Sequence, residues 1–308
     1  MDEYITVAVW CYNSSNTIIE TLESIFSQTY RNLNLAINDD YSQDNTIEIV
    51  ENWIDKHRER FGKIILNYNQ ENHGISYCFD SLLRLCDTRW VKGIAGDDIL
   101  MPNCCESNMR YLQENNIDTL VYSECIPFSN CGEQLVINPY NLRYAKELGK
   151  MPVEKQYKFL LRRDMPFSPT FFINVERYVM LGGIPLDIRN IEDWPLKLLF
   201  SSKGEKIYFM DEKTVLYRVG NSISHSESKL YNEDHIKQRK QLKEKMVYPH
   251  IPRYHIVYYG REILDEFRVS FAIKILKNKK NRVTIMIDSF LKICNIFRWR
   301  EYVMRLIR

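Results

Sequence analysis

Residues 7–46, "VAVWCYNSSNTIIETLESIFSQTYRNLNLAINDDYSQDNT", contain two apolar runs separated by an amphipathic stretch, and this arrangement decides the expected fold. The β-branched runs at 4–11 and 33–38 predict buried strands. Between them apolar residues recur at helical spacing, and Thr17 with Glu20 fits a capping box at the start of a helix. Strand, helix and strand in this order predict a β-α-β unit.

The alternation continues along the chain. A helical stripe follows Thr46, a third strand is predicted at Ile64–Tyr68, and an amphipathic helix at 75–86 precedes a strand that ends just before Asp97. Strands that alternate with helices predict an α/β fold with a mostly parallel, Rossmann-like sheet that helices cover on both faces.

Beyond residue 119 the alternation weakens. The segment 127–140 is rich in turn residues, a helix is predicted at 153–162, and strands are predicted at 170–174, 206–210 and 214–219. Past residue 231 the sequence is charged and helical. We therefore expect an α/β domain at 1–230, whose halves divide near residue 118, and a helical basic C-terminal region at 231–308.

Four polar clusters follow the four predicted strands: "CYNSSN", "NDDYSQDN", "NHG" and "GDD". In parallel sheets ligands bind beyond the carboxyl ends of the strands. The clusters therefore predict one shared site. In the last of them Asp97 and Asp98 are expected to point together into this space, where their charges repel unless a cation or hydrogen-bond donors compensate.

Composition excludes several classes of protein. With 308 residues, 45% of them hydrophobic, the chain is long enough for a large globular domain, and its net charge of only +2 does not indicate a nucleic-acid partner. No apolar stretch approaches the roughly 20 residues that span a bilayer. Neither a P-loop nor a Ser-His-Asp order is present, so a nucleotide kinase and a hydrolase have no support.

Cysteine usage indicates the cellular compartment. The eight cysteines form no CxxC pair and follow no apolar leader, so disulfides and structural zinc are poorly supported. Buried free thiols in a reducing environment are the better interpretation. We expect a cytoplasmic protein.

The ordered set of motifs, with "LGGIP", "EDWPLKLLF" and "YRVGNSIS" after the four clusters, resembles the inverting glycosyltransferases of the GT-A fold, family two. The similarity extends over residues 4–224. It implies an enzyme whose half at 1–118 binds a nucleotide-sugar donor and whose half at 119–230 binds the acceptor.

The resemblance also implies roles for the polar clusters. The carboxylate of Asp39 would accept the imide N–H of a uracil-type base, with Asp40 as a weaker candidate. A metal, Mn²⁺ or Mg²⁺, would bridge Asp97 to the donor diphosphate, because hard oxygen ligands suit these ions. Asp97 matches the last acid of the family's D-x-D motif, whereas Ala95 replaces its first acid, so that contact is absent or supplied by Asp98. The remaining donor-binding candidates are Tyr12, Asn13, Asn72, Gly74 and Gly96, with "NHG" either a plain turn or a loop that closes on the nucleotide.

"IEDWPLKLLF" carries the expected catalytic base. Asp193 can be a plain N-cap of a helix, and the resemblance assigns it the additional role of general base. Its neighbour Glu192 is expected to raise the proton affinity of Asp193 by like-charge repulsion and to lie at the substrate. Trp194 offers either an apolar platform for a sugar or an ordinary core side chain.

The end of the domain departs from the family. Many members carry a histidine after "YR", where this chain has Val219 and Gly220. His225, a few residues later, is a candidate replacement as phosphate contact or metal ligand.

These observations predict a metal-dependent inverting hexosyltransferase. It would move a sugar from a nucleotide diphosphate, with uridine as the expected base, to a hydroxyl of a glycan or lipid-linked oligosaccharide in bacterial surface polysaccharide synthesis, as in O-antigen assembly. A catalytically silent sugar-nucleotide-binding or scaffold module is the alternative, because Ala95 marks a lost acid. A nucleotidyltransferase is disfavoured, since "CYNSSNTI" lacks the Gly, Lys or Arg of its usual loop.

The C-terminal end adds an expected partner. From Arg268 onward the only acids are Asp288 and Glu301, and lysines and arginines interleave with apolar residues. This composition suits peripheral binding to an anionic membrane surface, although a charged helix packed on the domain would have the same composition.

Overall fold

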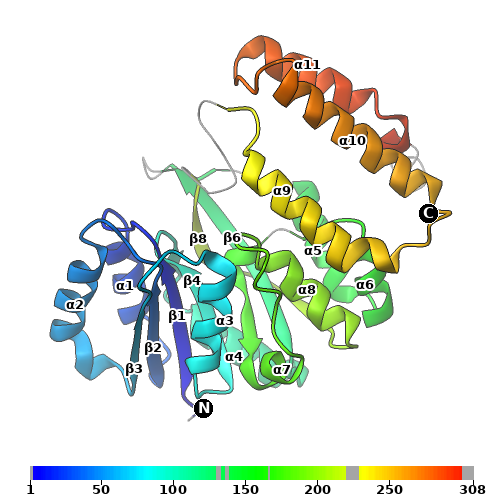
Figure 1. The fold of residues 1–308 in the computed structure, drawn as a ribbon. Coiled ribbons are helices and arrows are strands. Elements are labelled where there is room, and N and C mark those ends of the chain that lie inside the picture. Colours follow the sequence, from blue (N-terminus) through cyan, green and yellow to red (C-terminus); the bar gives the residue numbers. More distant parts are fainter. Residues whose placement is uncertain (1–2, 130–132, 136–138, 166, 220–228, 300–308) are drawn as a thin grey trace. The chain divides into compact units, whose positions relative to one another are not determined.

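The computed structural model describes residues 3–129, 133–135, 139–165, 167–219 and 229–299. The chain divides into two units, residues 1–220 and residues 221–308 (Figure 1). The sequence placed this division at residue 230. His225 and Gly220 lie outside the described residues.

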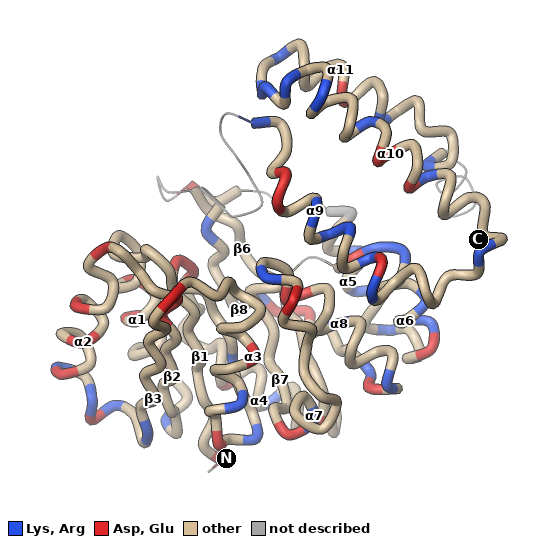
Figure 2. The backbone as a smooth tube through the Cα atoms, viewed as in Figure 1, with Lys and Arg blue, Asp and Glu red and all other residues tan. Residues whose placement is uncertain are grey.

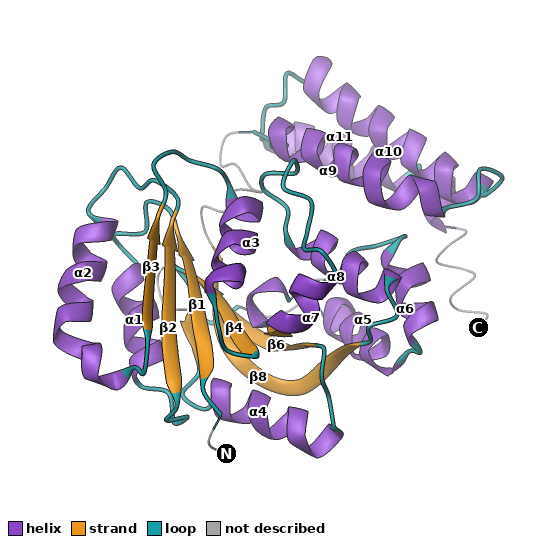
Figure 3. Ribbon diagram, turned by 60° about the horizontal axis from the view of Figure 1, so that its bottom comes forward, coloured by secondary structure: helices purple, strands orange, loops and turns teal. Residues whose placement is uncertain are grey.

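The first unit is built on one eight-stranded sheet with the order β3-β2-β1-β4-β7-β6-β8-β5 (Figure 3). The strands β1 to β4 are parallel to one another, whereas β7 is antiparallel to both of its neighbours and β5 is antiparallel to β8. The strands are β1 (Ile5–Cys11), β2 (Leu33–Asp39), β3 (Ile64–Tyr68), β4 (Trp90–Ala95), β5 (Ile99–Leu100), β6 (Leu120–Ser129), β7 (Phe172–Asn174) and β8 (Ile207–Val219).

Helices cover both faces of this sheet. The connections from β1 to β2 and from β2 to β3 place α1 and α2 on one face of the sheet. The connection from β3 returns past β2 and β1 to β4 and places α3 on the other face, where it packs on β1 and β2 (Figure 3). The helices of this unit are α1 (Ile18–Phe26), α2 (Thr46–His57), α3 (Ile75–Leu85), α4 (Cys104–Asn115), α5 (Pro139–Lys150), α6 (Val153–Leu160), α7 (Val175–Met180) and α8 (Asp193–Ser202), with short 3₁₀ turns at Arg58–Arg60 and Ser168–Thr170.

The apolar core lies between the sheet and these helices. Every residue of β1 and of β2 is buried, as expected for central strands of a parallel sheet, whereas β3 at the edge is only partly buried. The predicted α/β fold is confirmed. Of the described cysteines, six are buried and Cys294 is exposed, so free buried thiols are confirmed for those six.

Three local predictions are wrong. The capping box of Thr17 and Glu20 does not form, because the Thr17 hydroxyl donates to the carbonyl of Gly96, 2.8 Å away. The two strands predicted at 206–210 and 214–219 are one strand, β8. The segment predicted as turn-rich contains the end of β6 and the start of α5.

Strand β6 was missed because it contains Pro127, which cannot donate a ladder hydrogen bond. β7 pairs only with Leu120 and Val121 of β6, so Pro127 lies beyond that pairing, beside the isolated bridge of Phe128 and Gln134, where its carbonyl accepts the N–H of Leu135 at 2.7 Å. The register of β6 against β8 also shifts around Glu124, which breaks the alternation that a strand prediction relies on.

The second unit is helical, as predicted. It contains α9 (Glu233–Leu242), a π-helical turn at Lys243–Val247, a 3₁₀ turn at Tyr248–His250, α10 (Ile256–Lys274) and α11 (Arg282–Ile293). A capping box of Asn281 and Thr284 begins α11. Among the described helices, none combines the length and the apolar character that crossing a bilayer requires.

Candidate active site

The four polar clusters meet at one edge of the sheet. Strands β3, β2, β1 and β4 are adjacent and parallel, so their carboxyl ends lie side by side and the loops that follow them lie along the same edge of the sheet. Hydrogen bonds join the loops directly: the N–H of Ser14 donates to the Thr46 hydroxyl at 2.8 Å, and the N–H of Ser15 to Asp44 at 3.1 Å. The predicted convergence of these clusters is confirmed.

The first loop carries two donor-binding candidates, Asn13, which is hydrogen-bonded within the protein, and Tyr12, which is exposed. Asn13, at φ 51°, donates its N–H to the Ser42 hydroxyl at 2.8 Å, and its side-chain oxygen accepts the N–H of Gln43 at 2.7 Å. The Asn13 side chain therefore holds two loops together. Tyr12 is 48% exposed at the rim of the crevice.

Asp39 ends β2 as predicted, but it is not an exposed acceptor. It is 1% exposed, and its two carboxylate oxygens accept hydrogen bonds from the N–H and the hydroxyl of Ser42, at 2.8 and 2.5 Å. A carboxylate that accepts from a residue three positions later closes a tight turn. In this structure the buried carboxylate of Asp39 stabilises the turn of the second loop.

Asp40 orders the loop of "NHG". Its carboxylate accepts the backbone N–H groups of His73 and Gly74, at 2.9 and 2.8 Å, and the amide of Asn69 at 2.9 Å. From the other side Arg189 donates to the carbonyl of His73 at 3.0 Å. Asp40 is thus a positioning group, which differs from the predicted contact with the nucleotide.

Gly74 has a steric role in this loop. Its φ of 86° with a ψ of 163° is a combination that essentially only glycine adopts, and a Cβ there would lie 2.8 Å from the carbonyl oxygen of Arg189. The guanidinium of Arg189 also contacts the backbone carbonyl and side-chain oxygen of Asn72, at 2.5 and 3.0 Å. Arg189, which sequence reasoning missed, clamps the loop against the segment before α8.

The two adjacent aspartates after β4 point apart, contrary to prediction. Asp97 is exposed, whereas Asp98 is 1% exposed and accepts the backbone N–H of Arg218 at 2.8 Å. Burial and the neighbouring Asp97 raise the pKa of Asp98 well above its usual range. Asp98 therefore belongs to the fold of the loop, and Asp97 alone faces the solvent.

Arg218 is the positive group that the acidic pair required. From the end of β8 its guanidinium donates to the backbone carbonyl of Asp97 at 2.7 Å and pairs with Glu20 of α1 at 2.8 Å. The signal was visible as the arginine of "YRVGNSIS", whose role could not be assigned from the sequence. It ties the acidic loop to the strand across the sheet.

Gly96 serves close packing between these loops. A Cβ on Gly96 would lie 2.8 Å from the Cβ of Cys11, and its N–H donates to the Trp10 carbonyl at 2.8 Å. A side chain at this position would push the acidic loop away from β1. Its available contact with a ligand is through the backbone alone.

Asp193 lies at the start of α8, one position inside the expected cap. Glu192 holds the N-cap position and makes no capping bond with its side chain. The Asp193 carboxylate accepts the N–H of Trp194 at 2.7 Å and a hydroxyl hydrogen bond from Ser168. The side chain of Asp193 remains 24% exposed, so the carboxylate is held in place yet reachable.

A buried lysine lies beneath this carboxylate. Lys197, one turn along α8, is 0% exposed, and its ammonium lies 3.5 Å from Asp193, 2.8 Å from Asp164 and 2.5 Å from the Met165 carbonyl. Two carboxylates and a carbonyl thus compensate the buried charge. Sequence reasoning missed this residue, although its i, i+4 spacing from Asp193 was visible.

The protonation states of the acidic pair are the reverse of the prediction. Burial opposes ionisation of Asp193, but the charge of Lys197 and the hydrogen bonds from Ser168 and Trp194 outweigh it and lower the pKa of Asp193. Burial and the charge of Asp193 raise the pKa of Glu192 to about 8. Asp193 is therefore the ionised member of the pair and Glu192 the protonated one at neutral pH.

Trp194 is a core side chain. It is 2% exposed, and its indole N–H donates to the Leu160 carbonyl at 2.9 Å. The alternative of an apolar platform for a sugar is wrong, because neither face of the ring is accessible.

Tyr217 connects the two acidic groups. Burial raises its pKa to about 12, and the charges of Asp98, Asp97 and Asp193 contribute to the same shift. The phenol of β8 therefore lies within electrostatic reach of both the loop after β4 and the start of α8. All three carboxylates therefore act on the same phenol.

A divalent metal fits this site in one way only. Within the described part of the chain no group of three His, Cys, Asp or Glu side chains is arranged to hold a metal ion. Asp97 is an exposed carboxylate, and Mg²⁺-type ions are commonly held by one or two carboxylates together with substrate phosphates. An exposed carboxylate such as that of Asp97 is compatible with an ion that arrives with a diphosphate, and its role as metal ligand stays a prediction.

Solved structures with the same architecture define the class of fold. The structure matches that of S. aureus TarS 1–349 in complex with UDP-GlcNAc, with a TM-score of 0.59 and 16% identity. The match covers 87% of this chain and 73% of the TarS chain. It also matches the mannosyltransferase PcManGT from Pyrobaculum calidifontis in complex with GDP-Man and Mn²⁺, with a TM-score of 0.54 and 16% identity. This match covers 96% of this chain and 71% of the PcManGT chain. The fold is the GT-A fold.

Sequence comparison then gives the family. Residues 6–166, half of the chain, match the family described as Glycosyl transferase family 2, and the protein belongs to this family. A curated relative, the UDP-Glc:alpha-D-GlcNAc-diphosphoundecaprenol beta-1,3-glucosyltransferase WfgD of Escherichia coli, is 28% identical over 184 residues, which cover 59% of this chain and 70% of the relative. The chain is a glycosyltransferase.

Proposed function

We propose that the protein is an inverting glycosyltransferase in which Asp193 is the general base. The observation that carries this proposal is the environment of its carboxylate, which Lys197 and Ser168 hold ionised while a quarter of the side chain stays exposed. Burial and the charge of Asp193 raise the pKa of Glu192 to about 8, so Glu192 is the less ionised of the two carboxylates at neutral pH. A single ionised carboxylate, that of Asp193, is what we expect for a one-step displacement that inverts the anomeric centre.

The reaction proceeds in one step. An acceptor hydroxyl oxygen attacks the anomeric carbon of the donor sugar, the bond from that carbon to the diphosphate oxygen breaks, and Asp193 receives the hydroxyl proton. Attack from the face opposite the leaving diphosphate inverts the anomeric centre. Lys197 keeps Asp193 ionised before the step, and Ser168 fixes the direction of its oxygen.

The donor half of the site is assigned to the loops at the sheet edge. Tyr12 offers an exposed ring for a nucleobase, Asp39 and Asp40 shape the loops beside it, and Asp97 would hold Mn²⁺ or Mg²⁺ with the donor diphosphate. Such an ion supplies charge stabilisation for the departing diphosphate. A uridine diphosphate sugar is the proposed donor, because WfgD is named for UDP-Glc and TarS was solved with UDP-GlcNAc.

The proposed acceptor is a lipid-linked oligosaccharide, and the proposed pathway is synthesis of a bacterial surface polysaccharide. Support comes from the name of WfgD, which specifies a diphosphoundecaprenol acceptor. A screen of nucleotide sugars by protection against thermal unfolding, with and without Mn²⁺, identifies the donor first, since a ligand that binds the folded state raises its melting temperature. Asp97→Ala should lose the Mn²⁺-dependent part of that protection.

The base is then tested by Asp193→Asn with the identified donor. The amide keeps the size and part of the hydrogen bonding, so donor binding should persist while single-turnover transfer slows by about 10²- to 10⁴-fold. Glu192→Gln is the matched control, and its rate should stay within about tenfold. Full transfer by Asp193→Asn would overturn the assignment, and donor binding without transfer in the unmutated protein would favour the silent binding module.

A further inference from the structure

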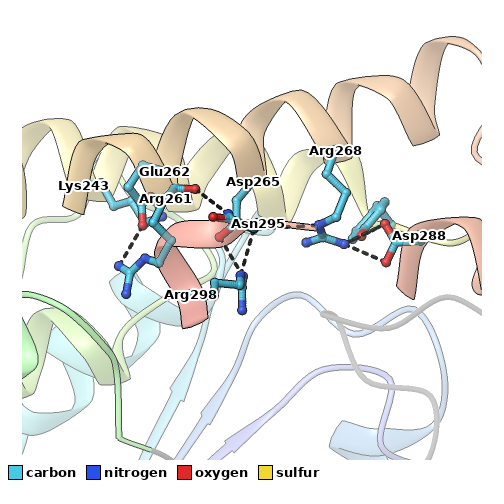
Figure 4. A network of polar contacts seen from close by, with 9 residues as sticks. Lys243, Arg261, Glu262, Asp265, Arg268, Asp288, Asn295 and Arg298 are labelled. Atoms are coloured by element: carbon cyan, nitrogen blue, oxygen red, sulfur yellow. Dashed lines mark hydrogen bonds and ion pairs between the residues drawn. The ribbon is translucent and has the colours of Figure 1, made fainter. Parts of the chain in front are cut away.

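The C-terminal unit contains a buried polar network. Arg268 of α10 pairs with Asp288 of α11 at 2.6 Å, and Arg298, which follows α11, pairs with Asp265 of α10 at 2.6 Å; all four side chains are largely buried except that of Arg298 (Figure 4). Asn295, also after α11, is 2% exposed and donates to the carbonyl of Arg261 at 3.0 Å. Ion pairs and hydrogen bonds therefore join α10 to α11 and to the segment that follows it.

The outer face of α11 is apolar. Four side chains at positions i, i+3, i+7 and i+10 fall on one face of the helix, and each is 58% to 66% exposed. We call this the α11 apolar face, and it consists of Val283, Met286, Phe290 and Ile293. A helix that exposes four large apolar side chains on one face departs from the usual arrangement in a protein surrounded by water.

Basic residues lie at both ends of α11. Lys277, Lys279 and Arg282 precede or begin α11, Lys292 lies near its end, and all four are exposed. Figure 2 shows the lysines and arginines at the start of α11 in blue. Between Arg268 and Trp299 the only acid is Asp288, which Arg268 already neutralises. The exposed charge around the α11 apolar face is therefore positive.

We propose that the α11 apolar face docks onto an anionic lipid bilayer. An amphipathic helix with apolar residues on one side and lysines or arginines at its borders lies in the plane of the headgroups, where the apolar side chains leave water and the cations meet lipid phosphates. The helix lies on the membrane and does not cross it, because α11 has only 12 residues.

A second copy of the chain is a poorer occupant for this face. Pairing two identical faces would bring Lys279, Arg282 and Lys292 of each copy close to those of the other, and like charges at an interface repel. An anionic surface satisfies both the apolar and the charged part of the face. This inference does not depend on which sugar is transferred.

The protein contains its own reporter of docking. Trp299 is 53% exposed and follows α11, whereas the other four tryptophans, at 10, 53, 90 and 194, are at most 7% exposed. Transfer of its ring from water to the bilayer should shift the fluorescence to shorter wavelength. Vesicles of phosphatidylglycerol and phosphatidylcholine are the probe, and vesicles of phosphatidylcholine alone are the neutral control.

The full chain should bind the anionic vesicles in co-sedimentation, with a blue shift of Trp299 and weaker binding at high salt. Met286→Ser with Phe290→Ser should weaken partition by about tenfold or more, and so should Lys279→Glu with Arg282→Glu, since each membrane-facing cation contributes about one kT or more. Met180→Ser is the matched control, because Met180 is 69% exposed on the first unit.

Several results would overturn the proposal. These are no binding of the unmutated chain, equal binding to neutral vesicles, or equal loss with Met180→Ser. A change of oligomeric state in Met286→Ser with Phe290→Ser would show an interface between copies instead. A lowered melting temperature of that variant without vesicles would show that the face packs on the protein. Donor binding, measured on the same variants, should stay unchanged and separates this test from that of the catalytic assignment.

Discussion

The two units of this chain solve the placement of apolar and charged residues in opposite ways. In residues 1–220 the strands β1 and β2 are buried throughout and the polar loops gather at one edge of the sheet. In the described part of residues 221–308, ion pairs join α10 to α11 and to the segment after it, and apolar side chains of α11 face outward. The first arrangement gathers polar loops above a largely apolar core, and the second leaves an apolar surface exposed.

The first unit also buries charged side chains. Lys197 is fully buried beneath Asp193, and Asp98 is buried next to the exposed Asp97. Lys92 of β4 is fully buried as well, and its ammonium donates to the carbonyls of Pro169 and Phe171, at 2.7 and 3.3 Å. Buried charged side chains therefore support both the candidate site and the framework of the first unit.

The largest effect is expected for the ion pairs of the second unit. Asp288→Ala leaves Arg268 without its closest acid partner, and removal of one member of a buried pair costs about 3–5 kcal/mol. Denaturant unfolding followed by Trp299 fluorescence reports on this unit. Asp211→Ala, whose partner Lys146 and own side chain are more exposed, is the control and should cost about 1 kcal/mol or less. An equal loss of unfolding free energy in Asp288→Ala and Asp211→Ala would contradict the structural role of the buried ion pair.

A similar loss in the first unit should come from an apolar truncation. Leu35→Ala in β2 empties space in a fully buried strand, which costs about 2–5 kcal/mol of unfolding free energy. Leu66 of the neighbouring strand β3, which pairs with Ile37, is 41% exposed, so Leu66→Ala should cost far less. Chemical denaturation followed by circular dichroism measures both, and an equal loss at the two positions would contradict the assigned core.

The buried lysine of the site should affect rate more than fold. Lys197 lowers the pKa of Asp193, so in Lys197→Met burial prevails and that pKa rises. A rate that needs ionised Asp193 then falls on the acidic side, by about tenfold for each pH unit below the new pKa, and recovers at higher pH. The pH profile of kcat is the measurement. Lys203→Met, at the exposed end of α8, should leave the acidic limb in place, and an unshifted limb in Lys197→Met would show a structural role alone.

The smallest effect is expected on the outer face of α11. Phe290 is 64% exposed, so Phe290→Ala should change unfolding free energy by no more than about 0.5 kcal/mol in the absence of lipid. Tyr258→Ala, at a buried aromatic of α10, is the contrasting variant in the same unit. If both variants lost several kcal/mol in thermal unfolding, the apolar residues of α11 would be core residues and the contrast between the units would disappear.

Some features of the site could be predicted because their signal is local. The strands that lead to Asp39 and Asp97 show apolar runs that end in polar clusters, and parallel connectivity alone brings such ends together. The roles within the clusters could not be predicted in this way. Whether Asp40 binds a ligand or the loop of Gly74 depends on backbone N–H groups more than 30 residues away.

The sequence by itself determined the order of strands and helices through the first half of the chain, the family, and the positions of the acids that carry chemistry, because hydrophobic period and motif spacing are properties of neighbouring residues. Only the tertiary structure decided which acid of each pair is exposed and which is ionised. Ser168 and Asp164 reach the neighbourhood of Asp193 and Lys197 from another segment, and Arg218 reaches Asp98 from across the sheet. Electrostatic interactions act through space, so the sequence contains the charges without showing their distances.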